Sequence, residues 1–121
     1  MTIETELFAL LGSLVDGRCH PDTTPDTPVF PCIVYQSVGG QAYDYVERKP
    51  PDSENYRIQI ICWTKRRAET TALALLVRQK IIEAGHAFKS AKTLGQAVSQ
   101  YEEPLKLYGS RQDFSIWLKV R

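Results

Sequence analysis

The chain has no surplus of charge of either sign. Its 121 residues carry 15 Lys and Arg against 14 Asp and Glu, which leaves a formal net charge of +1. A chain with this balance has no overall field to concentrate it on a polyanion or to repel it from one. A generic nucleic-acid binder is therefore disfavoured.

Cysteines and long apolar runs are scarce. Three cysteines, Cys19, Cys32 and Cys62, are an odd number without C-x-x-C spacing, whereas small secreted scaffolds carry even and denser sets. The N-terminal MTIETE is acidic where a signal peptide is basic, and no apolar run approaches the length of a bilayer span. We therefore expect a soluble protein that is not exported and works in a reducing compartment.

Signatures of catalysis and of metal binding are also missing. Cys62 lies among isoleucines, which favours a buried structural thiol over a nucleophile, and the only candidate bases, His20 and His86, belong to no recognised Cys and His signature. Cys19 and His20 lack the second ligand pair of a zinc site, and Gly39-Gly40 lacks the further glycines and lysine of a phosphate loop. We predict no catalytic, cofactor or metal site, and no enzyme.

The first half of the chain predicts one helix and a long hairpin. Thr2 can cap a helix that ends at Gly17 and carries one apolar stripe of Ile3, Leu7, Leu10, Leu11 and Leu14. The proline-rich residues 20–31 predict a loop, and PCIVYQSV predicts a strand over 31–38, with a bulge or bend at Gly39-Gly40. Residues 42–46 continue as a strand, the polar residues 47–54 turn, and 56–63 return with Tyr56, Ile58, Ile60 and Cys62 on the more apolar face.

The second half predicts a helix and two strands. Helical spacing over residues 64–84 places Leu73, Leu76, Val77, Ile81 and Ala84 on one side, with Gly85 as a C-terminal cap. Residues 93–101 and 113–121 read as strands, the second with alternating Phe114, Ile116, Leu118 and Val120. The predicted fold class is α+β, with two helices packed on a mainly antiparallel sheet in the order helix, strands, helix, strands, as a single domain over 1–121.

Three groups of residues are candidate contacts with partners. Leu75 and Ile82 form a second apolar strip on the later helix, which indicates either self-association or a helix enclosed within its own fold. Lys65, Arg66 and Arg67 oppose the macrodipole at a helix start, so they are either solvated surface or a contact with an acidic partner or, less favourably, with phosphate.

The turn over residues 47–54 is the third group. It is longer than the two to five or so residues that a hairpin needs, and its only apolar side chains are prolines. It is either a solvated connector or a projecting assembly contact that carries Glu47, Arg48, Lys49 and Asp52.

Four stretches together resemble a known family. LFALLGSLVDGRCHPD, PCIVYQSVGGQ, RIQIICWTKRRAETTALALLVRQKI and YEEPLKLYGSRQDFSIW, in this order and spacing, resemble the tail-completion, or tail-terminator, proteins of long-tailed phages and prophages. The chain departs from that pattern at Cys19, where a β-branched residue is expected, and at Gly109, where a basic residue is expected.

The resemblance implies a structural protein without cofactor or catalytic residues. It implies a homo-oligomeric ring, usually of six subunits, on the finished tail tube, which stops tube growth and presents a surface for joining the head. The implied partners are further copies of the chain, the tail tube protein and head-completion or connector proteins, without a membrane. The implied location is the virion tail, and the cytoplasm of the bacterial host during assembly. From the residues alone, a small nucleic-acid-binding or ligand-binding α+β module remains the alternative.

Overall fold

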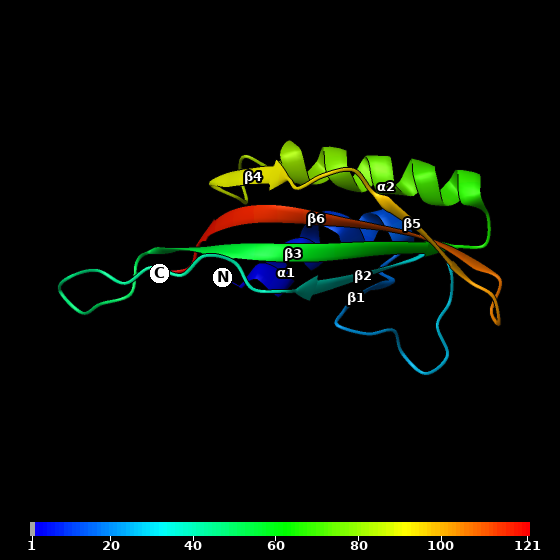
Figure 1. Cartoon of the computed structure of the whole chain (residues 1–121), viewed down its shortest axis with the longest axis horizontal. Helices are drawn as coiled ribbons and strands as arrows, with labels where there is room; N and C mark the ends of the chain where they lie inside the picture. The colour runs from blue at the N-terminus through cyan, green and yellow to red at the C-terminus, as the bar shows by residue number, and fades with distance from the viewer. Residues whose placement is uncertain (1) are drawn as a thin grey trace.

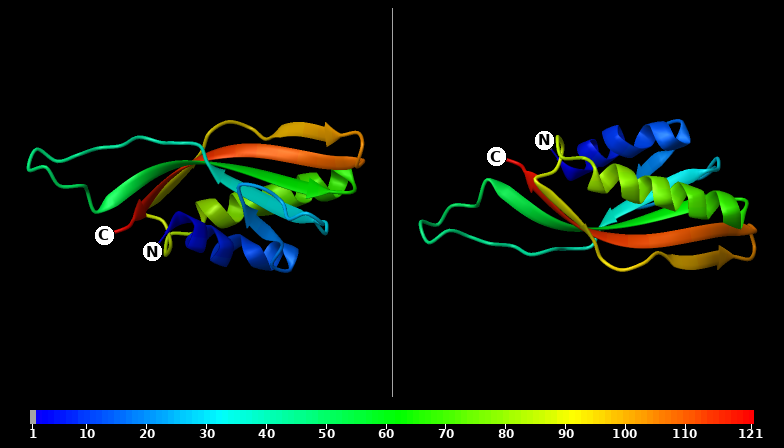
Figure 2. Two further views of the ribbon diagram at one scale, coloured as in Figure 1. Left: turned by 90° about the horizontal axis from the view of Figure 1, so that it is seen from below. Right: turned by 90° about the horizontal axis from the view of Figure 1, so that it is seen from above.

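The computed structural model describes residues 2–121 and confirms the predicted α+β class. A six-stranded sheet has both α-helices on one face, while its other face is open over most of its length (Figure 1, Figure 2). The elements, in chain order, are α1 (Ile3–Leu11), the 3-10 helix η1 (Gly12–Val15), β1 (Cys19–Pro21), β2 (Cys32–Ser37), β3 (Ser53–Thr64), α2 (Arg67–Ile82), β4 (Ser90–Thr93), β5 (Val98–Glu102) and β6 (Leu107–Lys119).

The first helix begins where the sequence predicts. The Thr5 backbone N–H donates to Oγ1 of Thr2 over 3.2 Å, which satisfies one of the free donors at the helix start. Ile3, Leu7 and Leu11 are buried, so the predicted stripe is the core face. The last turn tightens into η1 before the Gly17 N–H closes it on the Gly12 carbonyl.

The sheet has the order β1-β2-β3-β6-β4, with β5 also paired to β6. β1 and β2 are parallel, and all other pairs are antiparallel. The long strands β3 and β6 form the centre of the sheet, and their predicted alternation is confirmed. Side chains that face the helices are buried: Ile58, Ile60, Cys62, Phe114, Ile116 and Leu118. Val120 lies beyond the end of β6 and is half-buried.

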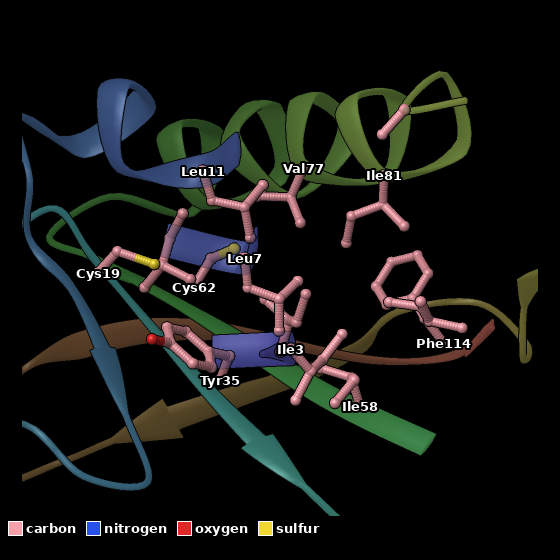
Figure 3. Close-up of a cluster of buried hydrophobic side chains, with 14 of the residues drawn as sticks. Ile3, Leu7, Leu11, Cys19, Tyr35, Ile58, Cys62, Val77, Ile81 and Phe114 are labelled. Atoms are coloured by element: carbon pink, nitrogen blue, oxygen red, sulfur yellow. The ribbon is translucent and has the colours of Figure 1, made fainter. Parts of the chain in front are cut away.

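The core lies between the two helices and this sheet face. Leu7 and Leu11 of α1 and Val77 and Ile81 of α2 point toward side chains of β3 and β6 (Figure 3). Each fully buried side chain of this size contributes about 1.5–3 kcal/mol relative to an exposed one. At the edge of the core, the Tyr35 hydroxyl donates to the Glu4 carbonyl over 3.3 Å, which ties β2 to α1.

Two strand assignments differ at the edges of the sheet. The predicted strand over 93–101 is wrong as one element, because Gly95, at φ +92°, separates β4 from β5. The Gln112 side chain donates to the Gly95 carbonyl over 2.9 Å and holds the break against β6. β1 begins at Cys19 and continues into the predicted loop, where it pairs with β2 over three positions only, too few to show a period.

Helix α2 is shorter than the predicted 64–84, because Thr64 still belongs to β3 and the helix starts at Arg67. Leu73, Val77 and Ile81 are buried as predicted, and Ala84 is buried just after the helix. The prediction for Leu76 is wrong, because it lies on the flank of this stripe and is exposed.

The predicted strand over residues 42–46 is also wrong. Residues 38–52, here called the arm, form a loop that projects past both termini (Figure 1). Gly39 and Gly40, at φ +108° and +133°, turn the chain away from the ladder with β3, so residues 42–46 have no strand partner.

Candidate functional site

The root of the arm is fixed to the sheet. The Val38 N–H donates to the Arg57 carbonyl, and the Arg57 N–H to the Gly39 carbonyl, each over 2.8 Å. A side chain at Gly40 would collide with the Asn55 carbonyl oxygen, so the close approach of these two backbones requires glycine. Further along, the Tyr43 ring stacks on Trp117 with centroids 5.8 Å apart. The arm therefore leaves the body in a defined direction.

The tip of the arm is held only by contacts within itself. The Tyr45 N–H donates to the Lys49 carbonyl over 3.1 Å, the Arg48 N–H donates to the Tyr45 carbonyl over 2.9 Å, and the Lys49 ammonium lies 5.9 Å from the Tyr45 ring centroid. Val46 is 99% exposed, so it contributes nothing to the core. A fully exposed apolar side chain gains free energy only when another surface covers it.

The structure places the predicted contacts of the 47–54 turn at two positions on the arm. Glu47, Arg48 and Lys49 are exposed at the tip. Asp52 lies at the return, where its carbonyl accepts hydrogen bonds from the backbone N–H groups of Val120 and Arg121. Ser53 and Glu54 already belong to β3, so the projecting segment starts and ends earlier than predicted. Whether these residues meet a partner stays a prediction.

The apolar strip on α2 is not covered by the residues that the structure describes. Leu75 is 63% exposed and Ile82 is 46% exposed. Both line a groove of about 590 Å³ between α2 and β4, together with Arg78, Gln79, Glu83, Lys92 and Thr93. A helix enclosed within its own fold does not describe α2, and the self-association predicted for this strip remains to be tested.

The three basic residues before and at the start of α2 differ in what they contact. Lys65 and Arg66 are exposed. The Arg67 guanidinium instead donates to the carbonyls of Gly109 and Gln100, over 2.9 and 2.8 Å, and lies 5.3 Å from the Tyr108 ring centroid. Arg67 thus fastens α2 to β5 and β6, which explains a cation at a helix start. A partner contact through these residues stays a prediction.

An apolar pocket lies at the C-terminal end of β3, and the sequence analysis did not predict it. Trp63 lies in a pocket of about 180 Å³, here called the end pocket, with the further lining residues Thr24, Pro28, Phe30, Glu102, Leu105 and Leu107. Gly109 of β6 is opposite Trp63, and a Cβ at Gly109 would lie only 2.6 Å from Cζ3 of the indole. The residues that line the end pocket come from segments far apart in the chain. The sequence feature that pointed to it was Gly109, which stands where the family pattern has a basic residue.

The three thiols are buried and unpaired, as predicted for Cys62. Burial raises the pKa of Cys19 and of Cys62 to about 12, and that of Cys32 to about 11. At neutral pH all three stay protonated and are poor nucleophiles.

Residues 2–121 offer neither a cluster of metal ligands nor a membrane-spanning helix. No cluster of three or more His, Cys, Asp or Glu side chains is placed there to hold a metal ion. In the same residues, no helix has both the length and the apolar character needed to cross a membrane.

The sequence matches the model of a known protein family over most of its length. The model described as "Tail completion protein gp17" matches residues 5–119. The chain belongs to this family of tail completion proteins. The family is structural and non-enzymatic, and a tail completion protein is a virion component. The resemblance found in the four sequence stretches is therefore confirmed.

The fold also matches a chain in a solved structure, the virion of a native gene transfer agent particle. The two chains are 17% identical, with a TM-score of 0.58 over 93% of this chain and 86% of that one. At this identity the likeness shows a shared fold. No curated protein sequence matches the chain significantly.

Proposed function

We propose that this tail completion protein forms a homo-oligomeric ring, of about six subunits, on the end of a finished tail tube. The ring stops tube growth and presents the surface to which the head is joined. Its partners are further copies of the chain, the tail tube protein and head-completion or connector proteins. Assembly takes place in the cytoplasm of the bacterial host, and the product stays in the virion tail.

The observation that carries the ring is the exposed apolar surface left on a chain that has a complete core of its own. Leu75 and Ile82 remain exposed on α2, and Val46 is exposed on the arm. Leu75 and Ile82 line one groove together, and contiguous exposed apolar surface marks interaction sites. The arm and the strip are different surfaces, so each can meet a different surface of a neighbouring copy. Such heterologous contacts close into a ring when the rotation between subunits allows it.

Membership of the tail completion family supports a position at the end of the tail, and the arm suits a contact there. A segment anchored at its root and exposed at its tip can order against a neighbour or against the end of the tube without changing the core. The near-neutral net charge of +1 also favours a protein surface over a polyanion as partner.

Tube growth in vitro tests the proposal. Tail tube subunits are polymerised with and without the protein, and tube lengths are measured by electron microscopy. We expect shorter tubes with one capped end, and no further growth when fresh tube subunits are added. Unchanged tube lengths and continued growth would contradict the capping role.

The same preparation separates the ring from a nucleic-acid-binding module. A nucleic-acid binder is retained on heparin or DNA and loses that retention steeply as salt rises, because counterions are released on binding. We expect little retention on heparin and an oligomer that is insensitive to salt. Steep salt-dependent retention without an oligomer would favour the other class.

A further inference from the structure

We propose that the end pocket around Trp63 receives the arm tip of a second copy of this chain, with Val46 inserted and Arg48 and Lys49 facing Glu102 and Glu103. This inference rests on the self-association proposed above and names the two surfaces that meet.

The arm and the end pocket lie at opposite ends of the molecule. The arm leads into Ser53, the first residue of β3, whereas Trp63 is next to the last residue of the same strand. At about 3.3 Å per residue, the ten steps between them span about 33 Å, and the arm points further away (Figure 1). The arm cannot reach its own pocket, so only another copy can bring the two together.

The end pocket is built to accept an apolar side chain. Phe30, Trp63 and Leu107 form its wall, and Leu105, 64% exposed, stands at its edge. The absence of a side chain at Gly109 lets the Trp63 indole lie close against β6, which leaves the space above it open. The arm tip offers a matching group, since Val46 is the most exposed of the large apolar side chains in residues 2–121.

The charge that lines the end pocket is opposite in sign to the net charge of the arm tip. Glu102 lines the end pocket and Glu103 follows it, while the nearby loop over residues 21–30 contains Asp22 and Asp26 and no cation. The cations at this end are Lys106, in the turn between β5 and β6, and the exposed Lys65 and Arg66, which follow Trp63 in the chain, but none of them lines the pocket. At the arm tip, Arg48 and Lys49 outnumber Glu47. Opposite charges at the rim of an apolar contact orient the partners and disfavour wrong pairings.

The groove beside Leu75 and Ile82 is the competing receptor for the arm. Its rim carries Arg78 and Lys92 against Glu83, so it would place cations opposite Arg48 and Lys49 of the tip. The charges thus favour the end pocket as the receptor.

A head-to-tail contact can be tested with two variants that each lose one half of it. Val46→Glu alters the arm and Leu105→Glu alters the end pocket, and both positions are exposed, so both proteins should fold, as circular dichroism will check. Each variant alone should associate about a hundredfold or more weakly than the parent, because a charge is placed in an apolar contact. Mixed one to one, the intact arm of the second variant meets the intact pocket of the first. We expect a heterodimer and nothing larger by sedimentation, with a shifted Trp63 indole signal in NMR spectra.

Charge reversal provides a second, independent experiment. Arg48→Glu and Glu102→Lys should each weaken association by about tenfold, and the variant with both changes should recover most of the loss.

A mixture of Val46→Glu and Leu105→Glu that stays monomeric at millimolar concentration with an unmoved Trp63 signal overturns the proposal, whatever the parent does on tail tubes. A heterodimer formed from Val46→Glu and Leu75→Glu, with Leu105→Glu assembling like the parent, assigns the arm to the α2 groove and also overturns it. A heterodimer of the first pair, with a parent that fails to cap tubes, supports the contact and rejects the ring on the tail.

Discussion

At the scale of single residues, two positions matter for stability. One is a buried thiol, and the other is a glycine whose missing side chain makes room for a neighbour. Cys62 is buried in the core, where Ile33 is its partner on β2. Gly109 leaves room for the Trp63 ring. Neither residue has a role in catalysis, so changes at both should be visible first in stability.

Changing Cys62 to Ala tests the buried thiol. Burial raises its pKa from 9.0 to about 12, so the folded state holds the protonated thiol while the unfolded chain ionises above pH 9. The protonated thiol therefore contributes fully to the free energy of unfolding below pH 9. This contribution is lost as pH rises toward 12, by up to about 1 kcal/mol per pH unit. Denaturant unfolding between pH 7 and 11 should show a shallower alkaline loss for Cys62→Ala than for the parent. Tyr35 and Tyr56 have raised pKa values in both proteins and leave a common slope, so identical pH profiles would contradict this account of the thiol.

Replacing all three cysteines by Ala tests whether any thiol has a chemical role. The variant should lose about a kcal/mol or more of stability per buried thiol, as expected for small changes in a packed core, and should still assemble. Tube capping is measured at a temperature where circular dichroism shows the variant to be folded. A folded variant that no longer caps tubes would show that a thiol is needed.

Gly109→Ala tests the contact beneath Trp63. The new Cβ would lie 2.6 Å from the indole, so Trp63 must tilt away from β6, and we expect a loss of about 1–3 kcal/mol with a shift in tryptophan fluorescence. Gly85→Ala is the matched control, because nothing lies within 4 Å of a Cβ there, and it should be neutral or slightly stabilising. Equal unfolding midpoints for the two variants would mean that Trp63 does not depend on Gly109.

At the scale of secondary-structure elements, α2 and the arm present surface that the fold does not use. The buried stripe of α2 is complete with Leu73, Val77 and Ile81, so Leu75 and Ile82 add nothing to the core. The arm is anchored at Gly40 and Tyr43 on its way out and at Asp52 on its return, whereas the hydrogen bonds of its tip, over Tyr45 to Lys49, lie within the tip.

Leu75→Glu and Ile82→Glu should weaken self-association while the monomer stays folded. Both positions are exposed, so the free energy of unfolding should change by less than about 0.5 kcal/mol. In the assembly, an unpaired charge in an apolar contact is strongly unfavourable. Ala72→Glu is the control, because it adds the same charge at an exposed position of α2 that does not line the groove. Sedimentation velocity checks all three proteins, and outright unfolding of both test variants would place the strip in the core.

Replacing residues 44–50 by a short Gly-Ser linker should leave the melting temperature within a few degrees of the parent. The contacts of Val38, Gly39 and Tyr43 with the sheet remain, and only the exposed tip is lost. Ring formation and tube capping should be impaired, as sedimentation and electron microscopy can show. A shortened protein that still assembles and caps tubes would make the arm a simple connector.

Local sequence patterns predicted most of the secondary structure. They failed where an element depends on pairing with a distant part of the chain. The alternation in β3 and β6 and the cap at Thr2 are local signals, and each predicted the observed element. β1 is set by a distant partner in β2, and the break between β4 and β5 by a hydrogen bond from Gln112, so neither leaves a pattern in its own residues. The end pocket is hidden for the same reason, because Phe30, Trp63 and Leu105 meet only in the folded chain. The exposure of Leu75 and Ile82 was predictable from helical spacing alone.

At the scale of the whole molecule, the chain is elongated, with the arm at one end and the turn between β5 and β6 at the other (Figure 2). Leu105 of that turn lines the end pocket. Two different ends of this kind suit repeated head-to-tail contact between copies of the chain. Membership of the tail completion family makes the chain a virion component, and the ring at the end of a tail is the arrangement proposed above.

Cryo-electron microscopy of tail tubes mixed with the purified protein tests the central claim most directly. The account predicts a closed ring of this chain at one end of each tube, with the arm of each subunit against its neighbour, and no protein along the side of the tube. Tubes with bare ends, or protein bound along their length, would contradict it.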